Sequence, residues 1–214
     1  MHSENAVVPR AHHWNRVYAE RGERGVSWFA EQPRVSLELL DDAGVGPQCS
    51  VLDVGAGASR LEDALIDRGH RSVSALDVSE QGLAVTRGRL GPRAARAKWI
   101  VTDLLDWVPD QRYQVWHDRA VFHFLTDPAD RARYLDVLDT ALTDDGIVVI
   151  ATFADDGPQA CSGLPTARYS PDQLLDELGG ADRWTRLGQR REPHTTPSGV
   201  VQAFTWLALR RRAA

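Results

Sequence analysis

The segment from Val51 to Leu61 constrains the fold of this chain more than any other. It reads VLDVGAGASRL, an apolar run followed by two glycines one residue apart and then by the start of an amphipathic segment. Glycine enters backbone conformations that other residues avoid and lets a ligand approach the main chain closely, here at the N-terminus of a helix. The segment therefore predicts a buried strand that turns sharply into a helix and presents backbone N–H groups to a ligand such as a nucleotide.

The rest of the chain alternates short apolar runs with longer amphipathic ones. Five runs rich in Val, Ile, Leu or Trp predict strands at Cys49–Asp53, Ser72–Asp77, Ala97–Thr102, Tyr113–Trp116 and Gly146–Phe153. Apolar residues three or four apart predict connecting helices at Leu61–Asp67, Glu80–Leu90 and Pro128–Leu142. Strands and helices in this alternation build a parallel sheet covered by helices on both faces.

Both ends of the chain depart from this alternation. Two helices are expected before it, at Ala11–Arg21 and Pro33–Ala43. After it, strand-like runs at Arg183–Arg191 and Gly199–Arg211 flank a turn rich in Pro, Thr, Ser and Gly at Pro193–Ser198. This pattern predicts a β-hairpin near the end of the chain.

Composition and charge exclude several classes of function. Lys and Arg total 25 against 30 Asp and Glu, a net charge of −5 that disfavours binding along nucleic acid. Cys49 and Cys161 stand alone, which argues against a disulfide framework or a zinc site, and no metal is expected. No apolar run approaches the roughly 18 residues that span a bilayer, and Met1–Asn5 lacks the pattern of a secretory signal. We therefore expect a cytoplasmic protein without membrane or nucleic-acid partners.

Three acidic residues lie at the ends of three consecutive predicted strands. Asp53 precedes Gly55 by two residues, Asp77 ends the second strand 22 residues after Gly55, and Asp103 follows the third. The carboxyl ends of parallel strands meet at one edge, where a carboxylate in the position of Asp77 can bind both ribose hydroxyls. Asp53 would repel a pyrophosphate but suits an ammonium group, and Arg60 stands where a dinucleotide fingerprint has its third glycine. NAD and FAD are thereby disfavoured.

Residues 49–153 resemble the class I S-adenosylmethionine-dependent methyltransferases. DVGAG at Asp53–Gly57 is similar to their first motif, Asp77 to their ribose-binding acid and Asp103 to their adenine-contacting acid. The resemblance implies a Rossmann-like α/β fold with a mostly parallel seven-stranded sheet, an antiparallel last strand and helices on both faces. It also implies that S-adenosyl-L-methionine places its ammonium group near Asp53. The remaining cofactor contacts implied at this edge are Gly55, Ala56, Gly57, Val78, Thr102 and Leu104. Ser59 replaces a third glycine of the family pattern, and we expect its hydroxyl to cap the following helix.

The sequence WHDRAVFHF at Trp116–Phe124 lies where the fourth strand ends and where groups that act on the methyl acceptor belong. His117, Asp118 and Arg119 are the catalytic candidates, and His117 is also expected beside the cofactor. Imidazole titrates near neutrality, so His117 can orient or deprotonate a nucleophile, with a structural hydrogen-bonding role as the alternative. The segment lacks the Asn/Asp-Pro-Pro-aromatic tetrapeptide of amino-directed nucleic-acid methyltransferases. Further histidines that can border the site are His123 and His194.

Two features are similar to the thiopurine, tellurite and halide methyltransferase clade. They are the Asp118-Arg119 pair and the aromatic N-terminal segment at Trp14–Tyr18. This second likeness implies that Trp14 and Tyr18 lie over the cofactor as a lid. An aromatic stripe with this spacing also fits a helix that packs in the core.

Three functions stay open on the sequence. The first is methyl transfer to a small-molecule acceptor by in-line displacement. The second is methylation of protein lysine, since several eukaryotic lysine methyltransferases share a Trp/Tyr-rich N-terminal segment and this core. A large acidic rim, for which Asp155, Asp156 and Asp172 are available, would favour it. The third is a catalytically silent, cofactor-binding scaffold.

All 214 residues are expected to form a single methyltransferase domain that acts as a monomer or homodimer. Residues 1–48 would supply helices over the site, residues 49–153 the cofactor-binding core, and residues 154–214 a substrate loop, a helix and the hairpin. Neither flank is long enough to fold readily as a domain of its own.

Overall fold

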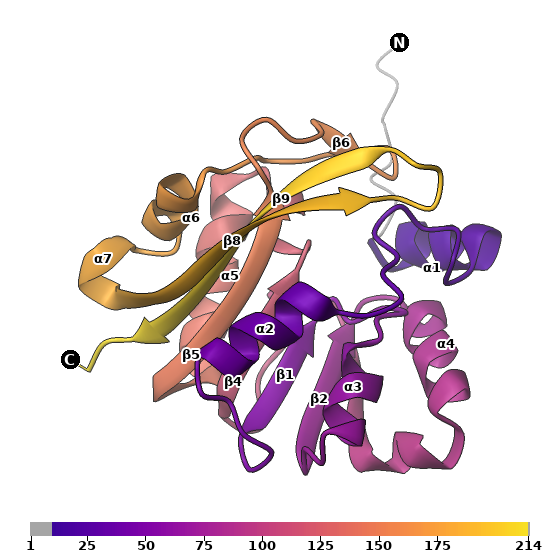
Figure 1. Ribbon diagram of the computed structural model, residues 1–214, viewed down its shortest axis with the longest axis horizontal. Helices are drawn as coiled ribbons and strands as arrows, with labels where there is room; N and C mark the ends of the chain where they lie inside the picture. The colour runs from indigo at the N-terminus through magenta and orange to yellow at the C-terminus, as the bar shows by residue number, and fades with distance from the viewer. Residues whose placement is uncertain (1–9, 214) are drawn as a thin grey trace.

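The computed structural model describes residues 10–213, so the segment Met1–Asn5, where no secretory signal is expected, lies outside the described residues. Its centre is a seven-stranded sheet in the order β3-β2-β1-β4-β5-β9-β8 (Figure 1). The strands of this sheet are β1 (Ser50–Val54), β2 (Ser72–Asp77), β3 (Ala97–Val101), β4 (Tyr113–Arg119), β5 (Leu142–Phe153), β8 (Trp184–Thr195) and β9 (Val201–Arg211). The pairs from β3 through β5 are all parallel. The mostly parallel α/β sheet predicted from the sequence is confirmed.

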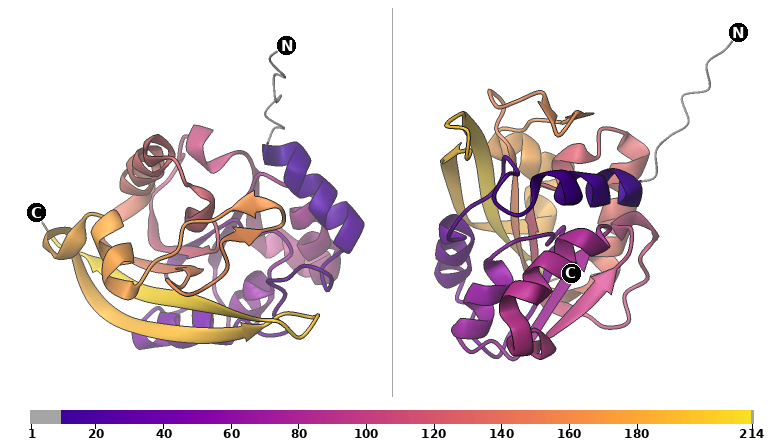
Figure 2. Two further views of the ribbon diagram at one scale, coloured as in Figure 1. Left: turned by 90° about the horizontal axis from the view of Figure 1, so that it is seen from above. Right: turned by 90° about the vertical axis from the view of Figure 1, so that its right-hand side faces the viewer.

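Helices cover both faces of the sheet (Figures 1 and 2). On one face, apolar side chains of α2 (Arg34–Asp42) and α3 (Leu61–Asp67) pack with Val51 and Val115 of the central strands, and α4 (Glu80–Leu90) lies beside β2. On the other face, α5 (Pro128–Ala141) and α6 (Pro171–Glu177) pack with Leu52 and Trp116. Because strand side chains alternate between faces, His117 and Arg119 lie toward α2, whereas Asp118 lies toward α5.

Shorter elements complete the chain. They are α1 (Arg10–Arg21), α7 (Gly180–Arg183), the 3₁₀ turns η1 (Gly91–Arg96), η2 (Leu104–Asp106) and η3 (Phe122–Phe124), and a small antiparallel ribbon of β6 (Ala160–Cys161) with β7 (Leu164–Pro165). None of the helices within residues 10–213 has both the length and the apolar character needed to cross a bilayer.

The hairpin at the end of the chain sits inside the sheet rather than beside it. β9 runs antiparallel between β5 and β8, as the family fold requires of its last strand. The predicted turn at Pro193–Ser198 is placed too early, because β8 continues to Thr195 and Pro193 pairs with Ala203. β8 is the edge strand of the sheet, where the missing N–H of a proline is tolerated.

Two central strands are longer than their apolar runs. β4 continues past the predicted end at Trp116 to Arg119, and β5 begins at Leu142 rather than Gly146. In both strands the additional residues are mostly polar. The end of β4 and the start of β5 therefore cannot be predicted from the pattern of apolar residues. The extension of β4 has a functional consequence, since it carries His117 and Arg119 to the edge where the site lies.

Candidate active site

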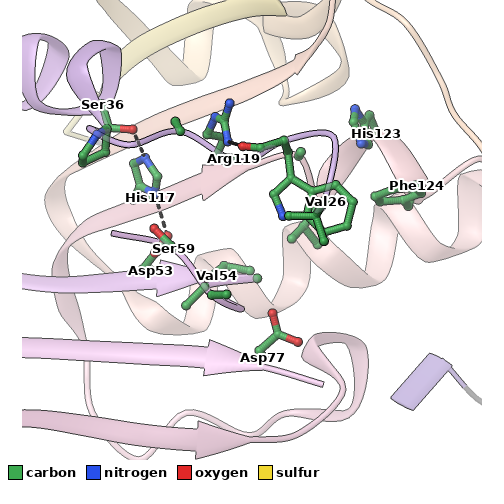
Figure 3. A pocket seen from close by; sticks show the side chains of 18 of the residues that line it. Val26, Ser36, Asp53, Val54, Ser59, Asp77, His117, Arg119, His123 and Phe124 are labelled. Carbon is green, nitrogen blue, oxygen red and sulfur yellow. Dashed lines mark hydrogen bonds and ion pairs between the residues drawn. The ribbon is translucent and has the colours of Figure 1, made fainter. Parts of the chain in front are cut away.

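A cavity opens at the carboxyl ends of the parallel strands, the edge selected from the sequence (Figure 3). Of the residues proposed from the sequence, it is lined by Trp14, Tyr18, Asp53, Gly55, Ala56, Asp77, Val78, Asp103, Leu104, His117 and Arg119. Gly57, Thr102 and Asp118 are not among its lining residues. The structure therefore gathers the three acids, the first glycine and both aromatic lid candidates around one space.

The glycine-rich turn after β1 has a left-handed backbone, with φ of +67° at Gly55 and +50° at Gly57. A Cβ atom on Gly55 would lie 2.0 Å from Cγ2 of Val121, and one on Gly57 would lie 1.9 Å from Oη of Tyr18. Both glycines are thus required by conformation and by close packing. Gly57 lies beneath Tyr18, which separates it from the cavity wall.

The two departures from glycine-rich patterns have local partners. Ser59 Oγ accepts a hydrogen bond from the N–H of Leu61 at 3.0 Å, which is the expected cap on α3. The Arg60 guanidinium donates to Glu23 at 2.8 Å and to Glu31 at 2.9 Å. Arg60 therefore ties the segment after α1 to the turn, a role that a dinucleotide-binding glycine would not have.

The three acids at the strand ends differ in environment. Burial raises the pKa of Asp53 to about 7, with the nearby charges of Asp118 and Asp77 acting in the same direction. Burial also raises the pKa of Asp77 to about 6, and one of its oxygens accepts a hydrogen bond from the N–H of Ser79 at 2.6 Å. Asp103 is partly exposed. Burial therefore makes these two carboxyl groups costly to ionise without a partner, which suits a cationic or hydroxyl-bearing ligand that compensates their charge or donates hydrogen bonds to them.

His117 is buried in a chain of hydrogen bonds. Its Nδ1 lies 2.6 Å from Asp53 Oδ1, and its Nε2 lies 2.9 Å from Ser36 Oγ of α2 (Figure 3). Burial lowers the pKa of His117 to about 4, so the ring is neutral near pH 7. With both nitrogens engaged, the ring fixes the Asp53 carboxylate and links it to α2. This geometry matches the structural alternative for His117 and makes it a positioning residue for Asp53.

Asp118 has a different environment from its neighbours in β4. Its carboxylate accepts hydrogen bonds from the N–H groups of Val121 (2.8 Å) and Phe122 (3.2 Å) and from Tyr134 Oη (2.8 Å). Burial raises its pKa to about 6. Tyr134 belongs to α5, and Asp118 itself is not among the residues that line the cavity. Asp118 thus anchors the turn after β4, and its position gives no support to a catalytic role.

Helix α1 lies over the cofactor edge, as the lid hypothesis expects. Arg10 at its start forms an ion pair with Asp103 at 3.1 Å. Asn15 Oδ1 accepts hydrogen bonds from Ser79 Oγ at 2.8 Å and from the N–H of Gln81 at 3.1 Å, which attaches the helix to the start of α4. Tyr18 covers Gly57 near its end. The helix therefore spans the distance from Asp103 to the glycine-rich turn.

Sequence reasoning missed most of the aromatic wall on the other side of the cavity. The missed residues are Phe29, which follows Trp28 in the loop after α1, and Phe153, Phe204 and Trp206, which come from the paired strands β5 and β9. From the sequence these strand residues are indistinguishable from ordinary core residues, because no local pattern predicts that β9 lies beside β5. His194 lines no part of this cavity, and its Nε2 lies 2.8 Å from the backbone oxygen of Ser27.

The residues at this edge fit S-adenosylmethionine. Asp77 offers oxygens to the ribose hydroxyls, and Asp53 offers a buried carboxylate to an ammonium group. The same acids would repel the pyrophosphate of NAD or FAD. Within residues 10–213 no group of three or more His, Cys, Asp or Glu side chains is placed to hold a metal ion.

Comparison with known proteins agrees with this geometry. A family model described as a methyltransferase domain matches residues 51–146. Over 121 residues, 55% of this chain, it is 27% identical to the eEF1A lysine and N-terminal methyltransferase of Mus musculus, and over 141 residues it is 26% identical to that of Homo sapiens. The matched parts are 17% and 19% of those proteins, so this chain spans less than a fifth of their length.

Solved structures show the same fold. A structure described by the conversion of a disulfide bond into a thioacetal group during echinomycin biosynthesis aligns with a TM-score of 0.71 and 23% identity, covering 94% of this chain and 91% of the other. The 1,6-didemethyltoxoflavin-N1-methyltransferase of Burkholderia thailandensis, solved with 1,6-didemethyltoxoflavin and S-adenosylhomocysteine, aligns with a TM-score of 0.68 and 22% identity, covering 94% and 83%. Residues 51–146 therefore match a methyltransferase domain, and in its fold and acidic edge the chain resembles the class I S-adenosylmethionine-dependent methyltransferases.

Proposed function

We propose that this enzyme methylates a small molecule. The observation that carries the proposal is the aromatic enclosure beside the cofactor edge, to which the N-terminal segment, η3, β5 and β9 all contribute. Trp14 packs edge-on against Trp28 and Phe124, with ring centroids 5.7 Å and 5.0 Å away. An enclosure of this kind suits a compact acceptor and keeps water from the reacting atoms.

The chain's own contribution to the reaction is mainly positioning. Bound S-adenosylmethionine supplies an electrophilic methyl group that a nucleophile displaces in line. In this scheme Asp53, held by His117, orients the ammonium end, and Asp77 orients the ribose, so that the methyl group faces the aromatic enclosure. His117 and Asp118 both use their polar atoms on protein partners. The acceptor atom we favour is therefore one that already carries a free lone pair at neutral pH, such as nitrogen or sulfur.

Methylation of protein lysine is the second candidate, because the curated relatives carry that activity in their names. An acidic rim was the feature expected to favour it. Asp155 and Asp156 lie 3.8 Å and 2.5 Å from Arg191, and Asp172 lies 2.6 Å from Arg186. Their charges are compensated, so these acids do not favour a basic peptide.

A labelling experiment separates the candidates. The purified protein is incubated with methyl-labelled S-adenosylmethionine and a desalted bacterial lysate supplemented with its own low-mass fraction. We expect label in the low-mass fraction, whereas label in protein bands would support the lysine alternative and contradict our proposal. Label in neither fraction would favour the scaffold.

The control variant is Gly55→Val, in which the added side chain would collide with Val121 and close the turn. We expect this variant to lose both cofactor binding and labelling. Binding is measured by calorimetry with S-adenosylhomocysteine, and NAD serves as the ligand that should not bind.

A further inference from the structure

The cavity contains a partly buried cation that has no carboxylate partner among the described residues. Arg119 lines the cavity, and its Nη1 donates to the backbone oxygen of Trp28 at 2.7 Å. Its Nη2 is buried and has no hydrogen-bond partner among the described residues, and none of their carboxylates lies within ion-pair distance. Glu192, the acid whose charge acts most on Arg119, accepts a hydrogen bond from Trp206 Nε1 instead. A guanidinium group in this state is incompletely compensated.

His123 adds a second unpaired donor to the same wall. The ring is fully buried, and its Nδ1 accepts a hydrogen bond from the N–H of Phe153 at 3.2 Å. Burial and the charge of Arg119 lower the pKa of His123 to about 3, so the ring is neutral and its single proton lies on Nε2. Nε2 is buried without a partner among the described residues. A neutral imidazole with this tautomer can only donate at that position.

Phe204 of β9 lies beside both donors. The Arg119 guanidinium carbon is 5.2 Å from the Phe204 ring centroid, and the His123 ring is 6.5 Å from it in a stacked arrangement. β9 is separated from β1 and β2, which carry the cofactor acids, by β4 and β5. Figure 3 shows Arg119 and His123 on the side of the cavity away from Asp77. We assign this side to the acceptor.

We infer that the methyl acceptor is a carboxylate-bearing small molecule, whose carboxylate oxygens accept hydrogen bonds from Arg119 Nη2 and His123 Nε2 while its apolar body packs against the aromatic wall. This inference rests on the proposed function, since it names the substrate class of the same site. A carboxylate satisfies both donors and compensates the guanidinium charge, which a neutral amide of the same shape does only in part. Arg119 is in this reading a specificity-determining residue.

The test uses matched acids and amides on the protein saturated with S-adenosylhomocysteine. Benzoate, phenylacetate and cinnamate are each compared with the corresponding primary amide by calorimetric competition or ligand-observed NMR. We expect at least one acid to bind tenfold or more tightly than its amide. If no acid is preferred over its amide by the unaltered protein, the inference is overturned.

The variants locate the preference. Arg119→Met should abolish the preference for the acid over its amide. Arg119→Lys should retain part of this preference, because a cation and a donor remain. His123→Phe, which keeps an aromatic ring but removes the donor, should weaken the preference several-fold. Arg191→Met, which removes an exposed arginine paired with Asp156, should leave it unchanged. A preference that survives in Arg119→Met contradicts the inference.

A parallel measurement of S-adenosylhomocysteine affinity keeps the two proposals apart. If Arg119→Met loses cofactor affinity as strongly as acid affinity, the guanidinium binds the cofactor's own carboxylate and the acceptor assignment is overturned. If the unaltered protein prefers acids but label enters protein in the lysate experiment, the carboxylate-binding site is supported and the proposal of a small-molecule acceptor is contradicted.

Discussion

Gly57 and Tyr18 share a contact that couples the shape of the glycine-rich turn to the position of α1, which is distant in the sequence. Tyr18 is buried, and its hydroxyl occupies the space in which a Cβ atom on Gly57 would stand. Burial raises the pKa of this phenol well above its ordinary value, so it remains a neutral donor at any physiological pH. Because residue 57 has no Cβ atom, Tyr18 can occupy this position and α1 can pack over the turn.

We expect Gly57→Ala to weaken S-adenosylhomocysteine binding by at least tenfold, because the new methyl group displaces Tyr18 and because φ at this position is +50°. The left-handed backbone alone costs alanine about 1 kcal/mol. The affinity is measured by calorimetry, and Tyr18→Phe added to Gly57→Ala should recover part of it by removing the colliding oxygen.

The matched control is Gly88→Ala in α4, where nothing lies within 4 Å of the added atom. This change should raise stability by about 0.5–1 kcal/mol and leave binding unaltered. Equal binding by Gly57→Ala and the unaltered protein would show that Tyr18 does not control the site.

Individual site residues were predictable from the sequence to different degrees. Asp53, Gly55 and Asp77 follow from position alone, since each stands at a strand end in a fixed spacing. His117 was selected for its chemistry, but its partner Ser36 comes from α2 and could not be named from a linear pattern. The sequence predicts that this strand ends at Trp116 and therefore says nothing about the directions of the following side chains. Because β4 continues to Arg119, its side chains alternate, and Asp118 faces the opposite side of the sheet from His117.

At the scale of elements, α1 is attached to the core mainly through its polar contacts with α4. Asn15 Oδ1 accepts hydrogen bonds at the start of that helix, among them one from Ser79 Oγ. Ser79 in turn caps the first turn of α4 by accepting a hydrogen bond from the N–H of Gly82. α1 also packs Val17 beside Tyr18 in a small cluster separate from the two main cores. An element held this way can open without unfolding the sheet.

We expect Asn15→Ala to raise the dissociation rate of S-adenosylhomocysteine roughly 5–30-fold, because two hydrogen bonds of about 1 kcal/mol each are lost from the closed position. Stopped-flow displacement measures the rate, and amide hydrogen exchange over residues 10–21 should increase in parallel. His12→Ala on the exposed side of the same helix is the control. An unchanged dissociation rate in Asn15→Ala would mean that α1 is a fixed wall instead of a lid.

Elements with one dominant periodicity were predictable almost to the residue. α3 and α4 begin and end as the sequence indicates, because the apolar spacing is regular in both and Ser79 caps α4. β5 was not, since Thr143, Asp144 and Asp145 near its start are polar and lie in a stretch where the register with β4 is interrupted. Side-chain patterns carry no information about such pairing.

At the scale of the whole molecule, buried acids make folding depend on pH. Glu62 of α3 is fully buried, and neither of its carboxyl oxygens has a hydrogen-bond partner among the described residues. Burial and the nearby Asp53 charge raise its pKa well above the ordinary value. The folded protein then holds a proton that the unfolded chain releases above about pH 4, so this group makes the protein less stable as pH rises.

We therefore expect Glu62→Gln to be more stable than the unaltered protein at pH 8, by on the order of 1 kcal/mol, and nearly equal to it at pH 5. Denaturant unfolding at both pH values gives the comparison, and taking the difference cancels the opposite effect of the buried histidines. Glu38→Gln, an exposed acid 3.4 Å from Arg34, should show no pH-dependent difference. Parallel curves for Glu62→Gln and the unaltered protein would show that folding does not raise the pKa of Glu62.

The position of β9 has a consequence for how the molecule is made. β5 completes the parallel part of the sheet. While residues 154–200 are still being synthesised, the edge of β5 that later pairs with β9 is unpaired, and the Phe153 side chain is not yet covered. During that interval a ribosome-bound chain presents an open, twelve-residue, largely apolar strand edge to the cell. Nascent chains of this protein should accordingly depend on chaperones until β9 emerges, because only then can Phe204 pack against Phe153.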